Sequence, residues 1–135
     1  DYALEVTVLP GCNVVDGIWE DVYTAGSQLG RDRSDYHVDH VVPLAQAWRA
    51  GADRYDDDTL KQIANDKDNL ILTSAYTNLA KGDSAIDTWF PENGSESYCE
   101  YAEKYATVVN RYDLAITQAE YDQINKMYGE CGMTL

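Results

Sequence analysis

Three short stretches of the chain carry residue types that could hydrolyse a phosphodiester bond. Asp39 and His40 stand together before an apolar run, Asn69 opens a second apolar run, and Asn78 and Lys81 follow it. This hydrolysis needs a base to activate water and positive charge to stabilise the phosphorane. One histidine, one carboxylate and one amide oxygen around a divalent cation can supply both. The three stretches therefore predict a metal-assisted hydrolytic site.

The elements expected around these residues would bring them together. Residues 36–42 alternate and are rich in β-branched side chains, which predicts a strand. Residues 69–73 predict a second strand, and residues 74–80 predict a helix that Gly82 ends. A helix that follows the second strand so closely would present Asn78 toward the end of the first strand. The pattern predicts a compact strand, strand, helix unit.

The two histidines and their neighbours need separate interpretation. Asp39 and His40 are adjacent, and neighbours in a regular strand point to opposite faces. They could serve one site if the strand bends or ends there, which Pro43 permits. His37 lies three residues before His40 and would also face away from it, so a shared zinc ion is poorly supported. A surface or loop-packing role is favoured for His37.

The rest of the chain predicts further strands before this unit and helices after it. Residues 3–9 and 12–19 indicate two strands separated by Pro10 and Gly11. Two short helices are expected between the motifs, at residues 44–52 and at 57–64 with Asp58 as N-cap. Two more are expected at the C-terminal end, 98–112 and 121–128, where tyrosines repeat every three or four residues on the core face. The expected fold class is α+β. Its 135 residues fit one domain, 1–135, with a core at about 36–83 and a C-terminal helical part at about 96–131.

The charge of the chain bears on what it could bind. The formal net charge is −14 at pH 7, from 24 acidic and 10 basic residues. Residues 31–81 hold seven of the basic residues against nine acidic ones, so the motif region is nearly neutral and an acidic shell surrounds it. Phosphate backbones are bound through Lys and Arg. A nucleic-acid substrate would therefore bind weakly and in a salt-sensitive manner.

The cysteines indicate where the chain works. Among the three, Cys99 and Cys131 are expected to form a disulfide that stabilises the fold by about 3 to 4 kcal/mol, which leaves the partner of Cys12 open. A disulfide predicts a secreted, extracellular protein. Three reduced thiols are the alternative. The chain begins with Asp rather than Met, which predicts a processed or shortened form, and no stretch approaches the roughly 18 apolar residues of a membrane span.

Taken together, the motifs resemble the HNH endonuclease superfamily, whose core is a ββα-metal unit. The resemblance rests on residues 38–43 (Val-Asp-His-Val-Val-Pro), 68–73 (Asp-Asn-Leu-Ile-Leu-Thr) and 81–83 (Lys-Gly-Asp). The chain is still more similar to small secreted bacterial HNH-type nucleases, over about residues 11 to 131, through these segments: 17–19, 39–44, 47–48, 51–52, 64–66, 69–70 and 89–91.

The resemblance implies a role for each motif residue. His40 would be the general base, and Asp39 and Asn78 would hold one divalent cation. Asn78 stands where the family name has a second histidine, which favours Mg²⁺, with Mn²⁺ or Ca²⁺ as alternatives. Asn69 belongs to the catalytic set because it would brace the loop after the histidine strand.

Two basic residues are candidates for binding substrate. Lys81 lies one helical turn past Asn78 and could reach a phosphate, although an ordinary lysine at a helix end is an equally good interpretation. Arg49 is the second candidate.

The sequence thus predicts a monomeric, secreted, metal-dependent endonuclease that acts on DNA, and on RNA as an alternative, with little sequence preference. A different class of protein remains open, a secreted acidic module that binds cations without catalysis. Its aspartate clusters at 56–58 and 66–68 lack the glycine and terminal glutamate of a calcium loop. A phosphodiesterase for small nucleotides is a further alternative.

Overall fold

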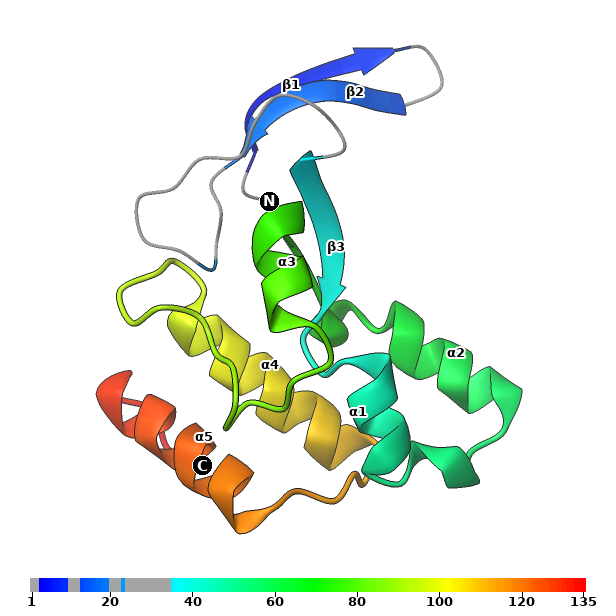
Figure 1. The fold of residues 1–135 in the computed structure, drawn as a ribbon, viewed down its shortest axis with the longest axis vertical. Coiled ribbons are helices and arrows are strands. Elements are labelled where there is room, and N and C mark those ends of the chain that lie inside the picture. The colour runs from blue at the N-terminus through cyan, green and yellow to red at the C-terminus, as the bar shows by residue number, and fades with distance from the viewer. Residues whose placement is uncertain (1–2, 10–12, 20–22, 24–34) are drawn as a thin grey trace.

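The computed structural model describes residues 3–9, 13–19, 23 and 35–135, and its elements are of the expected mixed α+β class (Figure 1). The strands and helices, in chain order, are β1 Ala3–Leu9, β2 Asn13–Trp19, β3 Tyr36–His40, α1 Leu44–Arg49, α2 Asp57–Asn65, β4 Leu70–Ser74, α3 Ala75–Lys81, α4 Tyr98–Arg111 and α5 Gln118–Glu130, with 3-10 turns η2 Ala52–Arg54 and η3 Lys67–Asn69.

The described strands form two antiparallel pairs, β1 with β2 and β3 with β4. The first pair confirms the two N-terminal strands predicted from the sequence. The turn expected at Pro10 and Gly11, and Cys12 itself, lie outside the described residues.

The strand, strand, helix unit is β3, β4 and α3. In its register Asp39 pairs with Ile71 and His40 pairs with Leu70. Ser74 ends β4 and caps α3, because its side chain accepts a hydrogen bond from the Thr77 backbone N–H. α3 therefore follows β4 without a loop and lies along β3 (Figure 1). The predicted helix start is confirmed.

β3 ends at His40, two residues earlier than the sequence predicts. The reason is the backbone that follows it. The Val41 N–H still bonds to the backbone oxygen of Asn69 at 2.9 Å, but Val42 N–H bonds to the Asn69 side chain at 2.7 Å. A side-chain contact thus replaces the backbone ladder at Val42, two residues after His40.

Two boundaries in the connecting helices differ from expectation. α1 ends at Arg49 and Gly51 takes a φ of +118°, a left-handed conformation that favours glycine, so the predicted helix to residue 52 is too long. The N-cap of α2 is Asp56, not Asp58, since the extended backbone at Asp56 lets its carboxylate accept from the Thr59 N–H.

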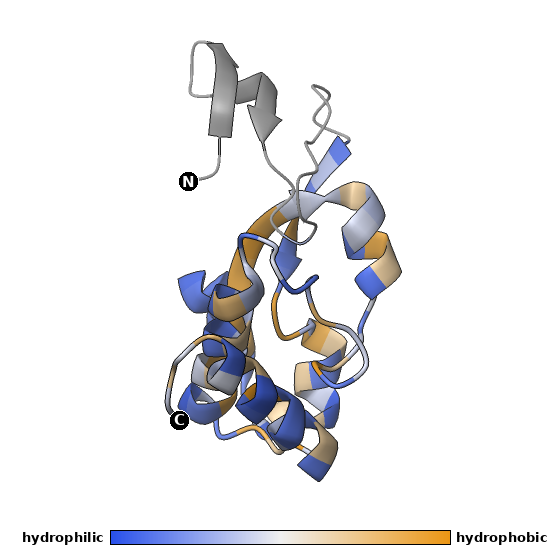
Figure 2. Cartoon of the chain, turned by 90° about the vertical axis from the view of Figure 1, so that its left-hand side faces the viewer, coloured by the Kyte–Doolittle hydropathy of each residue, from blue (hydrophilic) through white to orange (hydrophobic). Residues whose placement is uncertain are grey.

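The C-terminal helices provide a large part of the described core. Tyr101 and Tyr105 of α4 and Met127 of α5 are almost fully buried, which confirms the core role predicted for the repeating tyrosines of α4. Tyr121 of α5 is 44% exposed, so the prediction was wrong for this tyrosine. Hydrophilic and hydrophobic positions alternate along these helices (Figure 2). A disulfide joins Cys99 to Cys131, as predicted from the sequence. None of the described helices is long and apolar enough to span a membrane.

A charged cluster ties η3 to the end of α4. The Asp66 carboxylate accepts hydrogen bonds from Arg111 at 2.8 Å, from the Tyr112 hydroxyl at 2.6 Å and from the Asp68 N–H at 3.0 Å. Burial alone would raise the pKa of Asp66, but the hydrogen bonds from Tyr112 and Arg111 outweigh it and lower the pKa below 3.8. The ionised carboxylate therefore stabilises the native state.

We expect the free energy of unfolding of Asp66→Asn to fall below wild type at pH 7, with a difference that narrows under acid. A group whose pKa is lowered by folding contributes fully above its unfolded pKa, and its contribution is lost as pH falls through the folded value. Urea unfolding between pH 7 and pH 3 measures the difference. The exposed Asp53→Asn is the control. A difference that does not change with pH would contradict the assignment.

Candidate active site

The two faces of β3 carry different residues. His37 and Asp39 point toward α3, where Asn78 and Lys81 contact them. His40 points the other way, toward the end of α2. The structure therefore brings together the pairs His37 with Asn78 and Asp39 with Lys81, and it keeps the His40 side chain apart from both pairs.

His40 has the hydrogen bond that a general base needs. Its Nε2 lies 2.9 Å from the backbone oxygen of Ala64. A carbonyl oxygen can only accept, so Nε2 carries the proton and Nδ1 holds the lone pair. The side chain is half-buried at the end of its strand, and Nδ1 has no hydrogen-bond partner among the described residues. The imidazole is thus held in the tautomer that can take a proton from water.

Asp39 and Lys81 form a buried ion pair. Lys81 Nζ lies 2.9 Å and 3.1 Å from the two carboxylate oxygens of Asp39, and 2.6 Å from the backbone oxygen of His40. The Tyr23 hydroxyl also donates to Asp39, at 2.6 Å. Burial lowers the pKa of Lys81, and the Asp39 charge acts in the opposite direction. Removing such a pair from water costs free energy, and its complete set of hydrogen bonds offsets that cost.

The Asn69 side chain holds the turn after β3 in place through hydrogen bonds to its backbone. Its side chain is fully buried; Oδ1 accepts from Val42 N–H at 2.7 Å, and Nδ2 donates to the backbone oxygens of Val42 at 3.3 Å and Ile63 at 3.4 Å. Because Ile63 precedes Ala64, this one side chain connects the turn after His40 to the helix end that holds the His40 ring. Asn69 thus contacts the turn that it was expected to brace, and its part in the catalytic set stays a prediction.

We expect Asn69→Ala to lower the free energy of unfolding by about 2 to 3 kcal/mol, because it leaves the buried Val42 N–H without an acceptor. Urea unfolding measures the loss. Asn65→Ala is the matched control: Asn65 is exposed and donates only to the Lys61 backbone oxygen, so its cost should stay within about 0.5 kcal/mol. Equal costs for the two variants would refute the bracing role.

Asn78 contacts a histidine that the sequence did not connect with it. Asn78 Nδ2 lies 3.0 Å from His37 Nδ1, and both side chains are half-buried. The surface or loop-packing role expected for His37 missed this contact. A signal was present: His37 and Asp39 share a strand face by their spacing of two, and Asn78 and Lys81 share a helix face by their spacing of three.

Over residues 12–127 the chain matches the family described as GmrSD restriction endonucleases, C-terminal domain. The chain belongs to this family. The GmrSD C-terminal domain is an HNH-type nuclease domain, so the resemblance to HNH endonucleases is confirmed at the level of the family. The β3, β4 and α3 unit, with His40 at the strand end, is the part of this GmrSD C-terminal domain that carries the motifs.

A curated relative comes from Arthroderma benhamiae and is described as an uncharacterized secreted protein. It is 34% identical over 128 residues, which cover 93% of this chain and 61% of the relative. The GmrSD C-terminal domain described here thus spans less than two thirds of that protein. No solved structure matches the chain. The predicted extracellular location is confirmed: the relative is secreted, and disulfides such as Cys99–Cys131 persist outside the cytosol.

The two predicted phosphate contacts of this GmrSD C-terminal domain occupy different environments. The Lys81 side chain is completely buried, so its position does not fit a contact with substrate. Arg49 is exposed and bonds to the Asp83 carboxylate at 2.9 Å and to Gln46 at 2.9 Å. The hydrogen bond and the positive charge of Arg49 lower the pKa of Asp83. Of these two residues, only Arg49 lies on a surface that a phosphate could approach.

HNH-type nucleases typically use a divalent metal, and the donors available to one on this side of the site lie on α3 and β3. Mg²⁺ is usually held by one or two carboxylates together with water and phosphate oxygens. The only carboxylate on this face of β3, Asp39, is already neutralised by Lys81. The described residues contain no group of three His, Cys, Asp or Glu side chains that could hold a metal ion. As arranged, the Asp39 carboxylate does not fit as a ligand of a hard cation.

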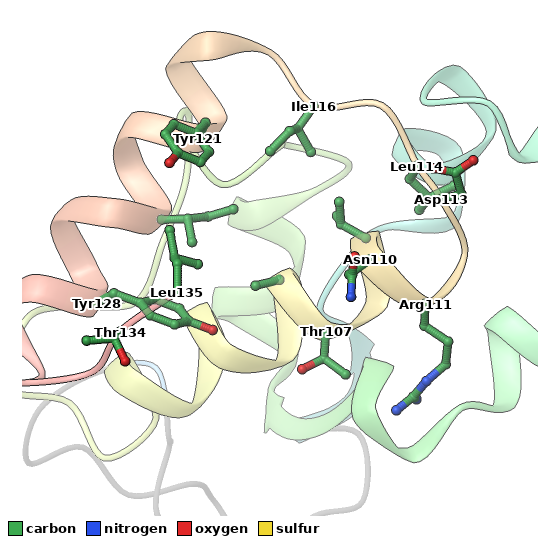
Figure 3. Close-up of a pocket in the computed structure, with 13 residues that line it drawn as sticks. Thr107, Asn110, Arg111, Asp113, Leu114, Ile116, Tyr121, Tyr128, Thr134 and Leu135 are labelled. Carbon is green, nitrogen blue, oxygen red and sulfur yellow. The ribbon is translucent and has the colours of Figure 1, made fainter.

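A groove of about 750 Å³ lies between α4 and α5 (Figure 3). Apolar side chains form much of its lining. Thr107 and Asn110 on α4 and Tyr121 and Tyr128 on α5 add polar groups to it. It contains none of the predicted site residues, and every polar contact that distinguishes His40 is made elsewhere. The groove therefore does not belong to the candidate active site.

Proposed function

We propose that this GmrSD C-terminal domain is an endonuclease that hydrolyses phosphodiester bonds of DNA with little sequence preference, and that it acts as a monomer. The observation that carries the proposal is the hydrogen bond between His40 Nε2 and the Ala64 oxygen, at the strand end of a ββα unit in an HNH-type family. It leaves Nδ1 as the basic nitrogen of a half-buried imidazole.

His40 is the proposed general base. As water attacks phosphorus, Nδ1 takes its proton, the new O–P bond forms and the P–O bond to the departing sugar oxygen breaks. Asn69 keeps the base in place because it fastens the turn after His40 to the Ile63 oxygen. Arg49 is the proposed contact for a neighbouring phosphate, reached by exchanging its surface ion pair with Asp83.

The reaction is proposed to require a divalent cation, with Mg²⁺ expected and Mn²⁺ or Ca²⁺ as alternatives, because HNH-type nucleases typically use one. Asn78 is the proposed protein donor. Its amide could turn from His37 toward a cation at a small cost, since both side chains are half-buried.

Supercoiled plasmid tests the proposal directly. The protein is incubated with plasmid and Mg²⁺, with EDTA in a parallel reaction, and the products are resolved on agarose. We expect open-circular and then linear DNA with Mg²⁺ and intact plasmid with EDTA. Intact plasmid in both reactions, together with calorimetric binding of Ca²⁺, would instead support the non-catalytic cation-binding module.

Two further substrates separate the remaining alternatives. Hydrolysis of a chromogenic phosphodiester without any nicking would identify a phosphodiesterase for small nucleotides. A single-stranded RNA of matched length shows whether RNA is also cleaved. Because the chain carries a net charge of −14, the nicking rate should fall as the salt concentration rises.

A further inference from the structure

We infer that Asp39 is the permanent counter-ion of Lys81 and not a ligand of the divalent cation, and that the pair positions His40 through its backbone. The inference deepens the proposed function, on which it rests for the role of His40. It departs from the metal role that the sequence predicts for Asp39.

The hydrogen bonds of Lys81 are complete. An ammonium group has three donors, and Lys81 Nζ has three acceptors, at 2.9 Å and 3.1 Å on Asp39 and at 2.6 Å on the His40 backbone. Asp39 in turn receives Lys81 on both oxygens and Tyr23 on one of them. Positive charge is thus already present where a metal would bind this carboxylate.

The surroundings of the pair exclude water. The side chain of Lys81 is 0% exposed and that of Asp39 is 7% exposed. The aromatic rings of Tyr23, Trp89 and Tyr101 pack against one another with centroids 5.0 to 5.7 Å apart. Lys81 Nζ lies about 6 Å from the ring centroids of Trp89 and Tyr101. Mg²⁺ gives up its water reluctantly. A dry pocket that already contains an ammonium ion is a poor site for it.

The pair acts on the backbone of the general base. Three consecutive residues, the last of β3 and the two that follow it, each bond to a different buried side chain: the His40 oxygen to Lys81, the Val41 oxygen to Tyr101 at 3.1 Å, and the Val42 N–H to Asn69. Asp39 is adjacent to His40 yet faces the opposite side, so it acts on His40 only through Lys81. We therefore regard Asp39 as a positioning residue.

The test compares Asp39→Asn, Lys81→Met and the double variant. Thermal unfolding in EDTA reports the ion pair without any metal. Each single variant buries one charge without its partner, whereas the double variant buries none. We expect the double variant to melt at a higher temperature than either single variant. If the melting temperature of the double variant does not exceed that of the more stable single variant, the inference is overturned.

Mn²⁺ titrated by calorimetry without nucleic acid reports the ligand role. We expect the dissociation constant of the double variant to stay within about threefold of wild type, and that of Asn78→Ala to rise at least tenfold. A tenfold rise in the double variant would make Asp39 a ligand and overturn the inference. Should Asp39→Asn fail to fold, the double variant still decides. Where no Mn²⁺ binds in the absence of nucleic acid, the melting comparison decides alone.

Plasmid nicking distinguishes positioning from a general effect on stability. Well below its melting temperature, the double variant should show a kcat lowered at least tenfold at unchanged KM and unchanged half-saturating Mg²⁺. An unchanged kcat would refute the positioning role. A wild-type protein that does not nick plasmid would refute the proposed function, and the melting and Mn²⁺ comparisons would still decide the role of Asp39.

Discussion

His40→Ala should lower the rate of plasmid nicking by about a hundredfold to ten-thousandfold, the usual contribution of a positioned general base. The substitution removes the only side chain at the strand end whose free nitrogen can take a proton from water, among the residues that the structure describes. It removes one hydrogen bond, to the Ala64 oxygen, and His40 is only half-buried. Folding should therefore survive.

The measurement is the initial rate of nicking at saturating Mg²⁺, with circular dichroism and thermal unfolding of the same preparations. Imidazole added to His40→Ala should restore part of the rate, because a free base can enter the space that the ring occupied. Asn65→Ala, at the end of the same helix that contacts His40, serves as the control with wild-type activity. Nicking by His40→Ala at the wild-type rate would end the assignment of His40 as base.

Elements with local signals were predictable from the sequence. Ser74 begins α3 and Gly82 ends it because capping depends on residues within one turn. The repeating tyrosines of α4 are buried as their spacing predicts. The errors lie at boundaries: whether Asp56 or Asp58 caps α2 depends on which of them has extended backbone, and the local sequence offers both.

The environment of Lys81 could not be predicted in the same way. Lysine is seldom fully buried, and at a helix end the expected position is in solvent. An aromatic cluster buries it, formed by Tyr23, Trp89 and Tyr101 from three different segments of the chain. Asp39 completes the pair from a fourth segment. No periodicity within one element reveals such a contact, because it arises only from tertiary packing.

The candidate site shows the same division. The order of His40, Asn69 and Asn78 along the chain predicted the ββα unit. Strand alternation indicated that Asp39 and His40 could share a site only if the strand bends or ends there. β3 does end at His40, yet the two side chains point to opposite sides. The hydrogen-bond partner of each polar group could not be predicted in this way. The Ala64 oxygen that orients His40 belongs to the end of a helix, and its position depends on how α2 packs against the turn that Asn69 holds.

The double variant Cys99→Ser/Cys131→Ser should lose about 3 to 4 kcal/mol in its free energy of unfolding. The bridge closes a loop with a sequence separation of 32. The loop contains α4 from its second residue onward and the whole of α5. In the chain-entropy description, a loop of this length restricts the unfolded chain by that amount. The native contacts of Tyr101 and Tyr105 do not depend on the bridge and should persist.

Urea unfolding of wild type with and without dithiothreitol, beside the serine variant, separates the two possible sources of this loss. If loop closure is responsible, reduced wild type and the serine variant should unfold at the same urea concentration, well below oxidised wild type. Cys12→Ser is the control and should match oxidised wild type. Equal midpoints for oxidised and reduced wild type would contradict the prediction, and a low midpoint for the serine variant alone would trace the loss to the new hydroxyl groups and not to the bridge.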